Sequence, residues 1–175
     1  MITRLSSSFT SPLSVVRLFC SLVRSGLEFG SISWNSLSLT QVEIIERVQK
    51  KFMRIIYDRY IGRKLFFSYD LLLPLFNLER LSTRRAVRDI HFLHKVVHGT
   101  VNTENLLMNI DFHVPFRSSR HFLTFYPTKI CESSPLCRMQ SAYNMICDCD
   151  VDIFLDFVSF KLALKKYILS NKELV

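Results

Sequence analysis

The chain has 175 residues, a formal charge of +8 and 49% hydrophobic residues, among them fifteen Phe. That length suits one domain, and so apolar a composition excludes a disordered chain. The charge is uneven, because the last 45 residues carry five basic and six acidic side chains, whereas the first 130 carry 18 basic and nine acidic. We therefore predict one folded domain over residues 1–175 with a basic surface in residues 1–130, which suits nucleic acid or another polyanion.

The N-terminal segment has some features of a targeting signal. Residues 1–27 lack acidic side chains and contain Arg4, Arg17 and Arg24 among several Ser, which is also typical of a mitochondrial transit peptide. The segment runs without a break into the rest of the chain, so we favour a helix. Arginines interrupt the apolar run that a secretory signal needs, and no apolar run reaches the roughly 18 residues of a membrane span. Five Cys, an odd number, indicate reduced thiols. We expect an intracellular protein, nuclear or cytoplasmic, that is neither secreted nor mitochondrial and has no membrane partner.

Helix signals dominate the first half of the chain. Ser11-Pro12 predicts a helix that runs to about Gly26 or Gly30. Thr40 and Glu43 form a capping box that starts a second helix. In this helix, apolar residues repeat at intervals of three and four and basic residues fall on the other side; the apolar set is Ile45, Val48, Phe52, Ile55 and Ile56, and the basic set is Arg47, Lys50, Lys51 and Arg54. Glu43 with Arg47 and Glu46 with Lys50 are favourable pairs four residues apart.

The second half is also helical. The sequence predicts a short helix over residues 69–73 stopped by Pro74, a longer one over 82–98 ended by Gly99, a short one from Thr103 to Met108, one from Ser134-Pro135 to about Cys147, and a last one over 157–169. Pro115 and Pro127 bracket an extended loop. The predicted fold is mainly α, a compact helical bundle-like domain with one long extended loop at about residues 113–130.

Catalytic motifs are missing from the sequence. It has no glycine-rich phosphate loop, no dinucleotide-binding or zinc-protease motif, and no two adjacent acidic residues. The acidic residues Asp148, Asp150, Asp152 and Asp156 could suggest a metal site, but such a local string beside a helix start more often compensates the helix dipole or is solvated.

Three histidines, His91, His94 and His98, share a narrow stripe of the predicted helix 82–98. They could bind zinc with further ligands from His113, Cys131, Cys137, Cys147 and Cys149, but no spacing matches a known zinc motif. We favour histidines at the boundary between the apolar and basic faces.

The predicted loop interleaves aromatic and basic residues: Phe116, Phe122, Phe125 and Tyr126 with Arg117, Arg120 and Lys129. Aromatic faces stack on bases and Arg pairs with phosphates, so this composition suits single-stranded nucleic acid. In the other interpretation, the aromatics pin the loop to the core while the arginines stay in water. Both stay open at the level of sequence.

Five segments in one order resemble a known family. They are LVRSGLEFGSISWN, IERVQKKFMRII, LFNLERLSTRRAVRDIHFLHKVVHG, VPFRSSRHF and SSPLCRMQSAYN. Together they resemble the C-terminal, thumb-adjacent tail of reverse transcriptases from non-LTR (LINE-type, jockey-like) retrotransposons, over about residues 11–169. Two departures are a missing Pro after Trp34 and a compact segment before the last helix.

The resemblance implies a non-catalytic fragment of an RNA-directed DNA polymerase. The family's polymerase carboxylates, which hold two metal ions, lie upstream of this tail, so no catalytic residue, metal site or cofactor carries over; the parent enzyme would use Mg²⁺. The implied role is to hold RNA or DNA, weakly and without sequence preference. Predicted phosphate contacts are Arg47, Lys50, Lys51, Arg54, Arg84, Arg85, Arg88, Arg117 and Arg120, and predicted stacking residues are Phe116 and Phe122.

Other partners and functions stay open. The polymerase core is a second possible partner, and an exposed apolar helix face, expected in residues 11–30, would favour self-association. Two alternative functions are a helical protein-interaction scaffold whose basic faces are merely solvated, and a metal-dependent hydrolase that uses His91, His94 and His98. Trp34 and the apolar stripe of the second helix are predicted to lie in the core.

Overall fold

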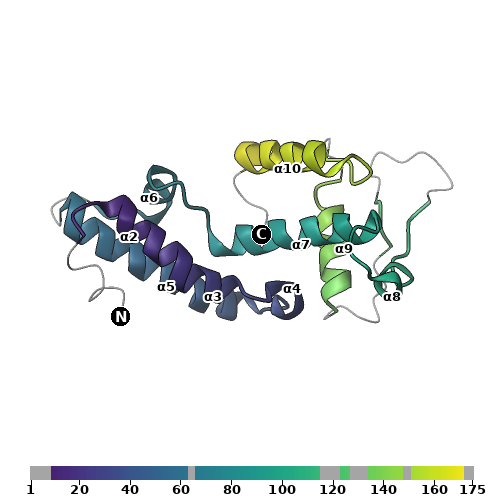
Figure 1. The fold of residues 1–175 in the computed structure, drawn as a ribbon, viewed down its shortest axis with the longest axis horizontal. Coiled ribbons are helices and arrows are strands. Elements are labelled where there is room, and N and C mark those ends of the chain that lie inside the picture. Colours follow the sequence, from purple (N-terminus) through teal and green to yellow (C-terminus); the bar gives the residue numbers. More distant parts are fainter. Residues whose placement is uncertain (1–8, 63–65, 115–122, 127–133, 148–150, 172–175) are drawn as a thin grey trace. The chain divides into compact units, whose positions relative to one another are not determined.

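The computed structural model of the chain describes residues 9–62, 66–114, 123–126, 134–147 and 151–171. These residues are mainly helical (Figure 1), which confirms the predicted fold class. In chain order the helices are α2 (Pro12–Phe19), the π-helix η1 (Cys20–Arg24), α3 (Ser25–Glu28), α4 (Ser31–Trp34), α5 (Leu39–Ile56), the π-helix η2 (Tyr57–Ile61), α6 (Tyr69–Leu75), α7 (Leu81–Val97), α8 (Glu104–Leu107), α9 (Pro135–Asn144) and α10 (Phe157–Asn171).

The chain divides into two compact units. The first comprises residues 1–31 and 37–84, and the second comprises residues 32–36 and 85–175. Each unit has a hydrophobic core of its own. Whether the chain behaves as the single domain predicted from its length stays a prediction.

The first unit begins with the helix predicted from Ser11-Pro12. Ser11 is extended and the proline takes the first helical turn, where its missing N–H would have no partner in any case. The chain then stays helical through α2, η1 and α3 to Glu28, and Gly30, two residues later, has φ 62°. The buried Phe19 ring stacks on Phe52 of α5 with centroids 4.0 Å apart, so this helix packs along α5.

Helix α5 begins two residues before the predicted start. Ser38 is its N-cap: the Ser38 hydroxyl accepts from the Gln41 N–H, and Gln41 Oε1 accepts from the Ser38 N–H at 2.9 Å. The predicted box of Thr40 and Glu43 is therefore wrong. Ser38 and Gln41 fit the same spacing, and starting there adds a backbone hydrogen bond from the Val42 N–H to the Ser38 carbonyl at 3.0 Å.

The buried face of α5 is rotated relative to the predicted apolar stripe. Phe52 and Ile56 are buried as predicted, but Val48 is 39% exposed, whereas Glu46 and Gln49 are buried. The prediction for Val48 failed because positions 46, 49, 53 and 56 follow the same three-and-four spacing. The spacing of apolar residues alone therefore does not decide between two rotations of the helix that differ by about one residue.

Helix α6 runs two residues beyond its predicted stop. Pro74 lies inside the helix, because a proline in its last turn loses only one backbone bond. The helix ends at Leu75, and Asn77, two residues further along the chain, has φ 52°. The Leu78 N–H bonds to the Leu73 carbonyl at 2.9 Å and the Asn77 N–H bonds to the Pro74 carbonyl at 3.1 Å, so Asn77 closes α6 in a Schellman motif.

The end of α7 agrees with the prediction. Gly99 has φ 61°, the Thr100 N–H bonds to the Lys95 carbonyl at 3.0 Å, and the Gly99 N–H bonds to the Val96 carbonyl at 3.1 Å. This is again a Schellman motif, here with the glycine that a left-handed conformation favours. Short helix α8 comes after Thr103 as predicted, although the Thr103 side chain makes no capping bond.

The core of the second unit joins α7, α9 and α10. It contains Ile90 and Leu93 of α7, Met139 of α9, and Phe160 and Leu164 of α10, all at most 1% exposed. Helix α9 starts at Pro135 as predicted and ends three residues before the predicted Cys147, whereas α10 extends two residues beyond the predicted end.

Tyr143 of α9 fixes the segment that leads into α10. Its hydroxyl donates to the Val151 carbonyl at 2.7 Å and accepts from the Ile153 N–H at 2.9 Å. Burial, the largest cause, raises the pKa of Tyr143 to about 12, so the phenol keeps the proton that it donates.

Candidate nucleic-acid interface

Four basic side chains lie on the exposed side of α5, as predicted. Arg47, Lys50, Lys51 and Arg54 are all exposed, and their spacing places them on one side of the helix. This basic face spans eight residues, and its first and last cations are about 10 Å apart along the helix. Duplex DNA carries one phosphate per about 1.7 Å of its axis, so the basic face could meet several phosphates at once.

Neighbouring groups restrain three of these four cations. The Arg54 guanidinium lies 4.6 Å from the centroid of Phe67, and Lys50 Nζ lies 5.6 Å from that of Tyr69. Arg47 Nη2 lies 4.0 Å from Glu43 Oε2, which confirms the predicted pair. Because those two side chains are 68% and 59% exposed, their attraction is weak. All four cations therefore contribute positive charge to the face.

Arg84 of α7, another predicted phosphate contact, is bonded within the first unit. Its Nε lies 2.6 Å from Glu28 Oε1 and its Nη2 3.2 Å from Glu28 Oε2, while Nη1 lies 3.7 Å from Glu79 Oε2. The hydrogen bond to Glu28 is the largest cause that raises the pKa of Arg84. Since Glu28 is only 5% exposed, it needs this cation as a partner. Arg84 therefore balances a buried carboxylate.

Arg85, the next predicted contact, is inaccessible. Its side chain is 1% exposed, and its Nε donates to Asn35 Oδ1 at 2.9 Å. A guanidinium buried in this way cannot reach a phosphate, so Arg85 leaves the set of candidate contacts. Arg88 is half-buried.

Around Arg85 a polar network joins α7 and α9 to residues 32–36. Arg138 Nε donates to Asp89 Oδ2 at 3.0 Å, and Asn35 Nδ2 donates to the same oxygen at 2.9 Å. Arg138 also donates to the Ile32 carbonyl at 2.7 Å. Asp89 is 1% exposed, and Arg138, whose Nε lies 3.0 Å from Asp89 Oδ2, supplies a balancing positive charge within the second unit.

Trp34 lies at the edge of this network. It is 36% exposed, and its ring centroid lies 6.0 Å from the Arg85 guanidinium. The prediction that Trp34 belongs to the core is therefore wrong. An indole beside a buried guanidinium serves as a cation–π partner there.

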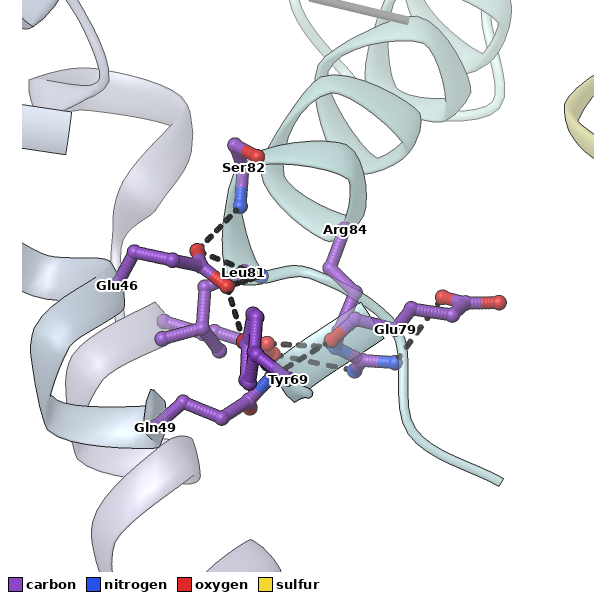
Figure 2. Close-up of polar contacts among 8 residues, drawn as sticks. Glu46, Gln49, Tyr69, Glu79, Leu81, Ser82 and Arg84 are labelled. Atoms are coloured by element: carbon purple, nitrogen blue, oxygen red, sulfur yellow. Dashed lines mark hydrogen bonds and ion pairs between the residues drawn. The ribbon is translucent and has the colours of Figure 1, made fainter. Parts of the chain in front are cut away.

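A second buried polar cluster forms where α5 meets the start of α7 (Figure 2). The Glu46 carboxylate accepts from the Tyr69 hydroxyl, from the Leu81 N–H at 3.0 Å and from the Ser82 N–H at 3.4 Å. Gln49 Nε2 donates to the Tyr69 oxygen at 2.9 Å and to the Glu79 carbonyl at 2.8 Å. Burial, followed by the bond to Glu46, raises the pKa of Tyr69.

The role of this cluster is structural. The carboxylate bonds two of the N–H groups that the first turn of α7 leaves without helical partners, and its charge opposes the positive end of the helix dipole. The predicted surface pair of Glu46 with Lys50 is wrong, because Glu46 is 6% exposed and faces α7.

The described part of the predicted loop is held by a backbone hydrogen bond within the loop and by a side chain of α9. The His113 N–H bonds to the Thr124 carbonyl at 3.0 Å, and Asn144 bonds both the N–H and the carbonyl of Phe125. Phe125 is fully buried, which matches the interpretation that aromatics pin the loop, whereas Tyr126 is 60% exposed. Four predicted contacts lie outside the described residues: Phe116, Arg117, Arg120 and Phe122.

Three histidines, two in α7 and one directly after it, contact other parts of the chain. His94 Nε2 lies 2.8 Å from the Leu155 carbonyl and His98 Nε2 lies 2.9 Å from the Ile153 carbonyl. A carbonyl only accepts, so each Nε2 carries a proton. His91 packs edge-on against Phe157 with ring centroids 5.5 Å apart. No group of three or more His, Cys, Asp or Glu suited to a metal ion occurs among the described residues.

Asp156, a carboxylate of the predicted acidic string, caps α10. Asp156 Oδ2 accepts from the Val158 N–H at 3.0 Å and the Ser159 N–H at 3.1 Å. Hydrogen bonds, first from the Ser159 side chain and then from its backbone, lower the pKa of Asp156. This agrees with the preferred interpretation of the acidic string for Asp156.

None of the comparisons identified a relative: neither the protein-family models, nor the curated proteins, nor the solved structures gave a significant match. A search for membrane spans in the described residues found no helix with the length and apolar character that crossing a bilayer requires.

Sequence reasoning missed several buried polar groups, among them Glu46 and Asp89. A signal for these two was present, because each falls within the buried spacing of its own helix: Glu46 with Met53 and Ile56, and Asp89 with Ala86 and Ile90. A charged residue in line with apolar residues predicts a buried, paired charge.

Proposed function

We propose that this chain contributes charge-driven contacts to RNA or DNA through the basic face of α5, without catalysing a reaction itself. This is the role implied by its resemblance to the C-terminal tail of non-LTR retrotransposon reverse transcriptases. The observation that carries the proposal is the exposure of Arg47, Lys50, Lys51 and Arg54 together on one side of one helix.

The contacts are weak and insensitive to base sequence. Lys and Arg on a convex helix face reach phosphate oxygens, and phosphates carry no sequence information. The basic face also stands between two acidic side chains, Glu43 and Asp58, which limit its extent along the helix. A footprint of about four phosphates is therefore expected.

The test compares two triple variants with the same loss of charge. Lys50→Ala/Lys51→Ala/Arg54→Ala removes most of the basic face, while Lys161→Ala/Lys165→Ala/Lys166→Ala removes three exposed lysines from α10. Binding is measured by fluorescence anisotropy with a labelled single-stranded RNA and a duplex DNA at low salt. The α5 variant is expected to bind at least about tenfold more weakly than the α10 variant.

Equal losses in both variants would mean that net charge, rather than the basic face, holds the nucleic acid. Unchanged binding in the α5 variant would favour the alternative of a helical interaction scaffold whose basic faces are solvated. Circular dichroism of each variant establishes that the helices are retained.

The non-catalytic part of the proposal has a separate assay. Polymerases position two metal ions with paired carboxylates, and the sequence has no adjacent acidic residues to do so. Purified chain is therefore expected to leave a primed RNA template unextended in the presence of Mg²⁺ and all four deoxynucleotides. Primer extension that depends on the metal would overturn this part.

A further inference from the structure

A groove of about 470 Å³ opens on the surface of the first unit. One wall is the continuous helix α2–η1, which contributes Leu13, Val16 and Arg17, with Arg24 further along. The other wall is the segment that closes α6, including Phe76 and Leu78. Val16 and Leu78 are each 6% exposed and form the floor, while Leu13 is 54% exposed at the rim. The groove therefore offers an apolar floor to a partner.

Two arginines line this groove, and its lining carries only positive charge. Arg17 is exposed and Arg24 is half-buried, and none of the residues that line the groove is acidic. With other described residues, neither guanidinium forms an ion pair or a hydrogen bond. The next carboxylate along the chain, Glu28, is buried and paired with Arg84. The two guanidinium charges beside the apolar floor are therefore available to pair with the carboxylates of a partner.

The spacing of the arginines indicates the shape of the partner. Arg17 and Arg24 are seven residues apart, which is about two helical turns or about 10 Å. Two acidic residues seven positions apart on another helix have the same separation and also face one side. An amphipathic helix lying along the groove would bring both carboxylates to the arginines and its apolar stripe to the floor.

We propose that this groove is the docking site for an acidic amphipathic helix of a partner protein. The site is separate from the basic face of α5, and the proposal does not rest on nucleic-acid binding. Charge complementarity argues against a second copy of the same groove as the occupant, because Arg17 and Arg24 would then meet their own like charges. An apolar floor between the arginines favours a peptide over a nucleic-acid backbone, which has no apolar side chains to bury.

The experiment uses two synthetic helical peptides of roughly 20 residues with the same leucine stripe. One carries two Glu about two turns apart beside the stripe, and the other carries Gln at those positions. Fluorescence anisotropy with the full chain is expected to show about tenfold tighter binding of the Glu peptide. Arg17→Glu/Arg24→Glu should abolish that preference, and a third peptide with Lys in place of Glu should bind this variant better than it binds the parent chain.

Two controls separate this site from general charge effects. Lys165→Glu/Lys166→Glu makes the same change of charge on α10 and should leave the preference for the Glu peptide unchanged. Lys50→Ala/Lys51→Ala/Arg54→Ala should also retain it, so that failure here and failure of nucleic-acid binding are distinguishable. Equal binding of the Glu and Gln peptides would overturn the proposal. So would equal losses in Arg17→Glu/Arg24→Glu and in the α10 variant, or displacement of the peptide by RNA through Arg17 and Arg24.

Discussion

Helices α5 and α7 carry similar numbers of cations in the sequence, yet the structure uses them in opposite ways. On α5 the basic residues 47, 50, 51 and 54 are all exposed. On α7, Arg84 is paired with a buried glutamate and Arg85 is itself buried. A run of basic residues therefore predicts an accessible surface only where its spacing avoids the buried face of the helix.

The largest loss of unfolding free energy is expected where a buried charge loses its partner. Asp89→Asn would leave Arg138 without its anion in the second unit, and breaking such a pair destabilises a protein by about 3–5 kcal/mol. The control is Asp70→Asn, which breaks a 2.8 Å ion pair with Arg80 whose side chains are 63% and 45% exposed. That substitution is expected to lower the free energy of unfolding by at most about 1 kcal/mol. Urea denaturation measures both, and equal effects would contradict the buried network.

A smaller loss is expected for the carboxylate that caps α7. Glu46→Ala leaves the Leu81 and Ser82 N–H groups and the Tyr69 hydroxyl without their acceptor. The expected loss of unfolding free energy is about 2–3 kcal/mol. Glu43→Ala on the exposed side of the same helix should change it by less than about 0.5 kcal/mol. If the two variants were equally stable in urea, Glu46 would have no capping role.

The pH dependence tests the histidines on the buried side of α7. Burial is the largest cause that lowers the pKa of both His91 and His94. The charges of Lys161 and Lys95 add to the effect at His91, whereas the hydrogen bond to the Leu155 carbonyl opposes it at His94. Since the folded state disfavours protonation, stability is fully present above the unfolded pKa of about 6.5 and falls as the pH drops below it. His91→Phe keeps the ring contact with Phe157 and removes one titrating group.

This variant should therefore lose less stability than the parent chain between pH 7 and pH 5, as measured by thermal melts across that range. An identical pH profile for the two proteins would show that His91 protonates as easily in the folded chain as in the unfolded one.

The smallest effect on stability is expected on the basic face itself. Lys50→Ala/Lys51→Ala should change the free energy of unfolding by about 0.5 kcal/mol or less, because both side chains are exposed and only Lys50 lies over a ring. A loss as large as that of Glu46→Ala in the same urea titration would mean that these lysines are structural.

The sequence predicted local features better than the rotation of helices. Proline after serine and glycine at a C-terminus act through their own backbone geometry, so the starts at Pro12 and Pro135 and the end at Gly99 were confirmed. The buried face of α5 depends on what packs against it. Tyr69 and the start of α7 lie 23 and 35 residues beyond Glu46 in the chain, and their hydrogen bonds hold the Glu46 side chain on the buried side of α5.

The candidate site was predictable to the same limited degree. The α5 cations were found because they lie opposite to Phe52 and Ile56, which are buried by any rotation that the spacing allows. Arg85 is buried where it bonds to Asn35, fifty residues away, and no local pattern predicts that contact.

The central claim is tested most directly by the salt dependence of nucleic-acid binding. If about four side chains of the basic face meet phosphates, log K should fall against log salt with a slope of about 3.6 in magnitude. In Lys50→Ala/Lys51→Ala/Arg54→Ala one contact remains, so the slope should drop to about 0.9, while Lys161→Ala/Lys165→Ala/Lys166→Ala should keep the parent value. A parent slope near zero, or the same slope in the parent chain and the α5 variant, would contradict the claim that this face binds the phosphate backbone.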